Sequence, residues 1–247
     1  MKRYIIYTTL LALFICCKNE KTELDNLLNE LENLSIDSES FNKFFTYTDE
    51  IIQTKNSKEL TKIAIELYHR IGYPSSKQAR ERLYIAVSFL DKALELNPRN
   101  EIAMENKVHF LGVLGDYTEA INTINWWIGD NEPSYKDYMQ MAFLFEASSL
   151  HDSSEIYFRY AEKKHLNTRF RKRDIEGRSH LAIIRAFLYG GDVGLCEIQE
   201  LVNETNHPTA HFIKDFYLQD FKRDEFIYRF VLDKPIMGDT IIINFGE

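Results

Sequence analysis

The sequence predicts an all-α protein built from antiparallel helix pairs, and three observations support this fold class. The 247 residues include only 10 Gly and 5 Pro, which is too few for the many tight turns of most all-β folds. Apolar residues recur at intervals of three and four, the spacing of one helix face, over much of the chain. From about residue 78, residues of similar size return every 34 positions, which indicates a repeat array.

Segment 24–77 is expected to form helices that precede the repeats. The first helix face consists of Leu24, Leu27, Leu28, Leu31 and Leu34. A second one consists of Phe41, Phe44, Phe45, Thr48, Ile51 and Ile52. A third helix is expected to begin at a Ser57 cap and to end at Gly72 and Pro74, because serine favours helix starts and these two residues favour ends. Its buried face is Leu60, Ile63, Ala64, Leu67 and Ile71.

Segment 78–210 contains a repeated motif of two helices joined by a short turn. Its clearest unit runs from Glu101 to Pro133 and contains the string Gly115-Asp116-Tyr117-Thr118-Glu119-Ala120-Ile121. The preceding half-unit supplies Ala86, Leu90, Ala93 and Pro98. Small residues let paired helices approach, and proline stops a helix before the next begins. These motifs resemble the tetratricopeptide repeat (TPR), and the resemblance implies a TPR-like α-solenoid.

Counting forward by 34 residues extends the repeat. The matched pairs are Val108 and Ala142, Ala120 and Ser154, Ile124 and Phe158, and Trp127 and Ala161. The second unit therefore spans Tyr135 to Thr168 without an insertion. A third unit repeats the turn at Gly191-Asp192-Val193 and places Cys196 at the small position. We expect Cys196 to be a buried packing residue and Trp127 to pack in the core.

Segment 211–247 is expected to cap the array. Apolar residues alternate from Phe226 to Leu232, and residues 240–245 are rich in β-branched side chains. Turn residues lie between them, so a small C-terminal β-hairpin fits this pattern. A helix that continues through Val231 is the alternative.

The first 16 residues have the layout of a secretory signal peptide. Lys2 and Arg3 precede an apolar run from Tyr4 to Ile15. This run is too short for a transmembrane helix, which needs roughly 20 apolar residues, and Lys18 begins a polar stretch. A short anchor or a buried first helix is the alternative.

The string Leu13-Phe14-Ile15-Cys16-Cys17 resembles the lipobox of bacterial lipoproteins. The resemblance implies that Cys17 is lipidated and becomes the N-terminus, with Cys16 as the alternative acceptor and residues 17–23 as a tether. Two or three acyl chains hold a protein stably on a membrane. The expected location is the bacterial cell envelope, and Lys18 after the acylated cysteine is compatible with the outer membrane.

The charge of the chain argues against nucleic acid as a partner. The formal net charge is −8, and it becomes −10 without Lys2 and Arg3. An acidic surface repels phosphate groups unless it carries a strong basic patch. The best such patch is Arg169, Arg171, Lys172 and Arg173. We interpret it as a solvated loop between helices, with a site for an acidic partner as the alternative.

No pattern indicates an enzyme, a cofactor or a metal site. The sequence lacks a phosphate-binding glycine loop, a GxSxG elbow, an HExxH helix and a CxxC pair. His207 and His211 have the i, i+4 spacing of metal ligands, but Pro208 between them suggests a helix start and no third ligand is evident. We interpret both as surface histidines.

In TPR proteins the first helices of successive repeats line a concave groove that receives a peptide or a protein segment. The resemblance therefore implies a partner-binding groove lined by Glu105, His109, Lys136, Met139, Phe143, Glu146, Arg178, Leu181, Arg185 and Tyr189. The alternative is that neighbouring helices or the terminal hairpin fill this groove. The expected function is a membrane-anchored scaffold for protein–protein interaction. The second hypothesis is a binding protein for a nutrient, a peptide or a toxin, with an immunity-like role.

Overall fold

The computed structural model describes Asn26 and residues 39–130, 132–168 and 174–228, and every regular element in this part of the chain is helical. This confirms the predicted all-α class with antiparallel helix pairs. The chain forms two compact units, residues 1–106 and 107–247. The boundary between the two units falls inside a helix. The boundaries expected from the sequence, at 77/78 and 210/211, separate segments with different residue patterns.

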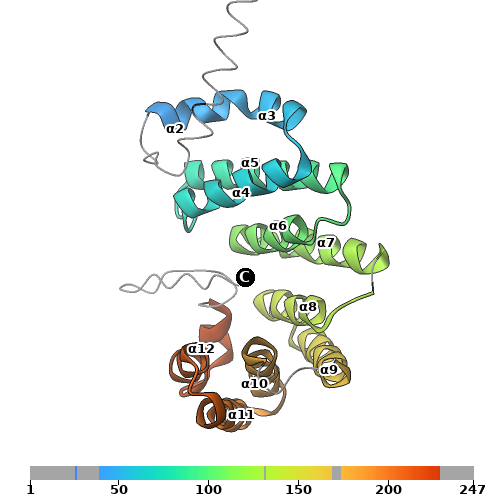
Figure 1. Ribbon diagram of the computed structural model, residues 1–247, viewed down its shortest axis with the longest axis vertical. Coiled ribbons are helices and arrows are strands. Elements are labelled where there is room, and N and C mark those ends of the chain that lie inside the picture. The colour runs from blue at the N-terminus through green and yellow to red at the C-terminus, as the bar shows by residue number, and fades with distance from the viewer. Residues whose placement is uncertain (1–25, 27–38, 131, 169–173, 229–247) are drawn as a thin grey trace, which may run out of the picture. The chain divides into compact units, whose positions relative to one another are not determined.

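Within residues 39–96, the first unit contains one long helix pair and three short helices before it (Figure 1). The short ones are α2 (Glu39–Phe44), η2 (Phe45–Tyr47) and α3 (Thr48–Thr54), and the pair is α4 (Ser57–Ile71) with α5 (Lys77–Leu96). Its core includes Leu60, Ala64 and Leu67 of α4, and Leu83, Ala86 and Leu90 of α5. The expected first helix at residues 24–34 lies outside the described residues, except for Asn26.

The α4 helix begins at Ser57 as expected, but its cap is Asn56. The Asn56 side chain accepts a hydrogen bond from Glu59 N, and the Glu59 carboxylate accepts one from Asn56 N, which is a capping box. Ser57 is instead buried, where its hydroxyl donates to Ala93 O at 2.7 Å and accepts from Asn100 Nδ2 at 2.8 Å. These hydrogen bonds of Ser57 therefore link α4 to the end of α5.

The second unit consists of helix pairs followed by a C-terminal helical segment (Figure 1). The helix α6 (Glu101–Leu114) crosses the division between the units. The later helices are α7 (Tyr117–Asp130), α8 (Tyr135–Ala147), α9 (His151–Asn167), α10 (Ile175–Tyr189) and α11 (Gly191–Thr205). The C-terminal segment consists of α12 (Pro208–Ile213), the π-helix η3 (Lys214–Leu218) and α13 (Arg223–Phe226). Helices α8 and α9 pack as one pair, and α10 and α11 as the next.

The 34-residue spacing places small residues in the packed interior in the first two repeats, but the spacing changes in the third repeat. Ala120 and Ser154 are completely buried near the starts of α7 and α9. Cys196 is exposed, so its predicted core position is wrong. Gly194 takes that position, 40 residues after Ser154, because α9 and the connection that follows it are both longer than α7 and its connection.

Gly194 allows α10 and α11 to approach closely. A Cβ atom at this position would lie 2.6 Å from Ala182 O and 2.6 Å from Ala186 Cβ. We expect Gly194→Ala to lower the free energy of unfolding of the second unit by about 2 kcal/mol, the usual cost of overpacking. Urea unfolding followed by tryptophan fluorescence measures this unit alone, because both tryptophans of the chain lie in α7.

Gly129→Ala is the matched control for this measurement. Gly129 is also helical, but an added Cβ would contact nothing within 4 Å. Alanine is a better helix former than glycine by about 1 kcal/mol, so this variant should be as stable as the wild type or more so. Equal losses in both variants would show that the α10–α11 contact is not close.

The end of the described chain is helical where the alternation of apolar residues begins. Phe226 lies in α13, and Ile227 and Tyr228 continue as helix, so the strand expected from Phe226 onward is wrong at these three residues. The rest of the predicted hairpin lies outside the described residues. So do the signal peptide, Cys17, the tether and the basic cluster at 169–173. None of the described helices is long and apolar enough to cross a membrane.

Candidate protein-binding groove

The candidate site is the surface of the second unit where helices α8 and α10 meet the C-terminal segment. Three of the predicted groove residues in α8, Met139, Phe143 and Glu146, are buried there. Phe187 of α10 and Phe226 of α13 complete the contact with Phe143. Phe143 is therefore covered by α10 and by α13 of the same chain.

Aromatic rings form the floor of this groove. The Phe143 ring centroid lies 5.4 Å from that of Phe158 and 5.6 Å from that of Phe187, both edge-on. Phe226 stacks on Phe143 at 5.6 Å and meets Phe187 edge-on at 5.1 Å. Such offset and edge-on pairs contribute about 0.5–1.5 kcal/mol each beyond the burial of area. Phe226 is therefore the apolar anchor of the C-terminal segment.

An ion pair between buried Glu146 and half-buried Arg223 lies beside the rings. Arg223 Nε and Nη2 donate to the two carboxylate oxygens of Glu146, each at 2.7 Å, and Arg223 Nη1 donates to Phe187 O at 2.8 Å. Burial alone would raise the pKa of Glu146, but the hydrogen bonds and the charge of Arg223 hold that pKa below its usual value. Glu146 is therefore ionised, and the two-pronged bond fixes where α13 sits.

A cavity of about 630 Å³ opens next to this ion pair. Its lining comes from the end of α8, the start of α9 and residues 222–225, and it consists of Glu146, His151, Asp152, Glu155, Lys222, Arg223, Asp224 and Glu225. Five of these eight side chains are carboxylates, so the cavity suits a cationic group. Among the described residues, no three or more His, Cys, Asp or Glu side chains are arranged to hold a metal ion.

The predicted groove residues of α10 lie on a different face of that helix from Phe187. Arg185 forms ion pairs with Glu162 of α9 and with Glu197 of α11, and the Tyr189 hydroxyl donates to Glu162 at 2.7 Å. Arg178 pairs with Glu204 of α11. Leu181 is half-buried. These residues therefore link α10 to α9 and α11 beside the groove. This agrees with the shifted register of the third repeat.

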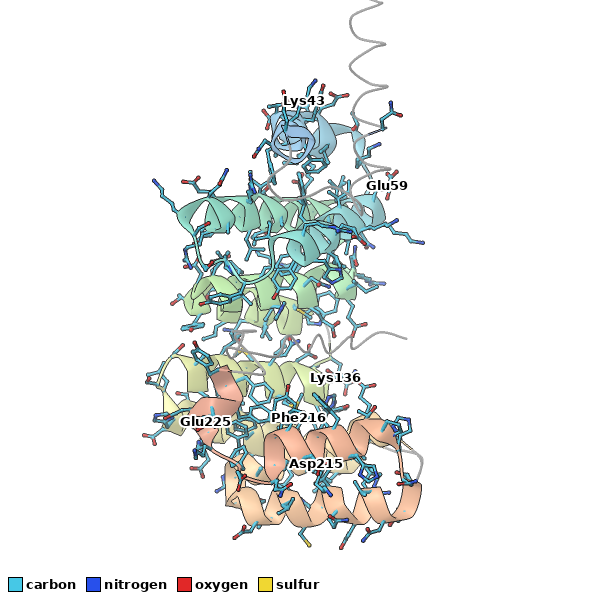
Figure 2. All side chains as sticks on the ribbon, turned by 90° about the vertical axis from the view of Figure 1, so that its left-hand side faces the viewer. Lys43, Glu59, Lys136, Asp215, Phe216 and Glu225 are labelled. Carbon is cyan, nitrogen blue, oxygen red and sulfur yellow. The ribbon has the colours of Figure 1, made fainter. Side chains whose placement is uncertain are left out.

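The remaining predicted residues do not meet at one place. Lys136 pairs with Glu176 of α10 at 2.6 Å near the start of α8, where Figure 2 labels it. Glu105 and His109 are half-buried on α6, and they fall in different compact units.

Sequence reasoning missed Phe187, Arg223 and Phe226 as groove residues. A signal was present for the last two, because an arginine three residues before a phenylalanine places both on one helix face. Nothing local in the sequence pairs them with Glu146, which lies 77 positions before Arg223.

No protein-family model matches this chain, and no curated protein matches it. Among solved structures, the chain is similar to the one titled "MamA 41-end from Desulfovibrio magneticus RS-1", with 14% sequence identity and a TM-score of 0.44. The match covers 75% of this chain and 97% of that one. The function of this chain therefore has to be inferred from its own residues.

Proposed function

We propose that this chain is a lipid-anchored scaffold of the bacterial cell envelope that binds a helical segment of a partner protein between α8 and α10. The observation that carries the proposal is that this groove already holds a short helix, α13, through a buried phenylalanine and an arginine. A surface that accepts a helix of its own chain has the shape and chemistry to accept another. The proposal assigns no catalytic step to the protein.

The groove has the composition expected of a helix-binding site. Recognition of a helix in a groove depends on a few apolar anchors spaced along one face, and aromatic and arginine side chains contribute most of the energy in such interfaces. Phe143 and Phe187 supply the apolar floor, and the buried carboxylate of Glu146 selects a cation at a fixed place. The groove thus favours a partner with an aromatic residue next to a basic one.

The lipid anchor is supported by the signal-like residues 1–16 and by Cys17, which follows them directly. When the full-length chain is expressed in a bacterium fed radiolabelled palmitate, we expect label on the wild type and none on Cys17→Ser. The Cys17→Ser protein should also leave the membrane fraction.

Cys16→Ser is the matched control for lipidation, since it changes the neighbouring thiol and leaves Cys17 in place. This variant should keep the label. Label on Cys17→Ser but not on Cys16→Ser would move the anchor by one residue, and label on neither wild type nor variants would remove the lipoprotein part of the proposal.

Partner binding is tested with the full-length chain in detergent-solubilised envelope. Glu146→Gln keeps the shape of the buried side chain and removes its charge, and Glu200→Gln makes the same change at an exposed residue of α11 that does not line the cavity. A protein partner that cross-links to wild type and Glu200→Gln, but less to a folded Glu146→Gln, supports the groove. Equal cross-linking to all three would exclude it.

A further inference from the structure

We infer that residues 221–228, here called the latch, compete with the partner for the α8–α10 groove. The partner segment would then be a helix that copies the latch, with an arginine three residues before an aromatic side chain. This inference rests on the proposed function, since it names the partner class and the regulation of the same groove.

The latch meets the groove through two side chains on one helical turn. Arg223 and Phe226 are three positions apart, so both point to the same side of α13. Arg223 binds Glu146 and also lies over the Phe187 ring, 5.1 Å from its centroid. Phe226 fills the space over Phe143. Any helix with the same two groups at this spacing could make the same contacts.

The latch has little structure of its own to keep it in place. The helix α13 is four residues long, and a helix this short is unstable in water without tertiary contacts. Its outer side is exposed at Lys222, Asp224 and Glu225, and Figure 2 labels Glu225 on this side. The latch can therefore open without unfolding α8 and α10, at the free-energy cost of the contacts of Arg223, Phe226 and Ile227 and of the ring contact between Phe221 and Phe187.

Charge determines which partner the open groove prefers. The latch carries Lys222 and Arg223 but also Asp224 and Glu225, so it adds no net charge to the cavity. Its specific contribution is the Arg223 guanidinium that binds Glu146. When the latch leaves, Glu146, Asp152 and Glu155 remain with His151 on the α8–α9 side, and a buried Glu146 without a cation is costly. A helix with an arginine at the position of Arg223 is the occupant that pairs this carboxylate again.

Competition within one chain is strong because the latch is tethered. A short tether gives the latch an effective concentration in the millimolar range, so a free segment at micromolar concentration cannot displace it. Weakening the latch raises the fraction of open groove, and the apparent affinity for a free segment rises by the same factor.

The first test needs no substitution. Hydrogen exchange of the full-length wild type compares the amides of Phe226 and Ile227, which bond to Lys222 O and Arg223 O, with the amide of Phe143 in α8. We expect the latch amides to be protected at least about tenfold less, because local opening needs less free energy than global unfolding. Equal protection would make α13 a permanent part of the core and would overturn the inference.

The second test uses a fluorescein-labelled peptide that copies residues 219–228. We expect it to bind the full-length Arg223→Ala variant at least about tenfold more tightly than the wild type, and a peptide lacking the arginine to bind neither. Asp224→Ala is the matched control, because it changes an exposed latch residue beside Arg223, and it should behave like the wild type. Equal binding to all proteins, or to none, overturns the latch.

The two proposals can fail separately. If an envelope protein cross-links through Glu146 but Arg223→Ala changes neither its yield nor peptide binding, the groove function stands and the latch is excluded. If Glu146→Gln has no effect on any partner while the peptide binds Arg223→Ala selectively, the latch stands as an internal contact and the scaffold proposal falls.

Discussion

Phe143→Ala is expected to lower the free energy of unfolding of the second unit by about 3–5 kcal/mol, the usual cost of replacing a buried phenylalanine by alanine. Phe143 is 4% exposed and touches the rings of Phe158, Phe187 and Phe226. Its removal leaves a cavity between four helices. The measurement is urea unfolding followed by tryptophan fluorescence.

Tyr189→Ala is the control, since it changes a second residue that the TPR resemblance placed in the same groove. Tyr189 is 49% exposed and donates one hydrogen bond, to Glu162, so its loss should cost no more than about 1 kcal/mol. A small effect of Phe143→Ala, equal to that of Tyr189→Ala, would mean that Phe143 faces solvent and that α13 does not cover it.

The contrast between these two residues shows what the sequence could predict. Helix existence and the small positions Ala120 and Ser154 depend on local spacing, and the structure places both in the core. The 34-residue count holds only while the helices and connections keep their length. It therefore failed at Cys196, where a longer helix and a longer connection moved the small position to Gly194.

The covering of the groove by α13 could not be predicted from local sequence patterns. Glu146 appeared as a charged residue on a first helix, which is typical of an exposed binding face. Its partner Arg223 lies in a segment whose apolar alternation from Phe226 onward indicated a strand. Only the packing of α13 onto Phe143 and Phe187 decides that this carboxylate is buried.

Acid is expected to lower the free energy of unfolding of the second unit because of a buried histidine outside the groove. His180 of α10 is 4% exposed, and its Nδ1 lies 3.0 Å from the Tyr135 hydroxyl. Burial raises the pKa of Tyr135, so this hydroxyl stays protonated. Burial lowers the pKa of His180 from 6.5 to about 4, against the attraction of Glu176.

The sign of the effect follows from where the proton binds. Below pH 6.5 the unfolded chain takes up a proton at His180 that the folded chain refuses until about pH 4, so stability falls as the pH falls through this window. The full loss corresponds to roughly 3 kcal/mol, at about 1.4 kcal/mol per pKa unit. Burial also lowers the pKa of His165, the neighbouring imidazole, which adds a loss of the same sign.

The charges around His180 set the lower end of the pH range in which this histidine costs stability. Lys136 and His165 disfavour a proton on His180, whereas Glu176 and Asp174 favour one. Burial alone would raise the pKa of Glu176, but the hydrogen bond to Lys136 and the positive charges of Lys136 and His180 together hold that pKa below 4.5. Its contribution to stability is therefore lost only as the pH falls below 4.5, so the interval from 6.5 to 4.5 reports mainly on the histidines.

Urea unfolding at pH 7.0, 6.0 and 5.0, followed by tryptophan fluorescence, measures this dependence. His180→Asn keeps a hydrogen-bonding group near Tyr135 and removes the titration, so the variant should be less stable than the wild type at pH 7 but should lose less stability by pH 5. His207→Asn is the matched control, because His207 is an exposed helix cap and asparagine caps equally well. It should keep the wild-type slope. If His180→Asn keeps that slope too, the acid sensitivity belongs to other groups, and His180 is not buried as a neutral imidazole.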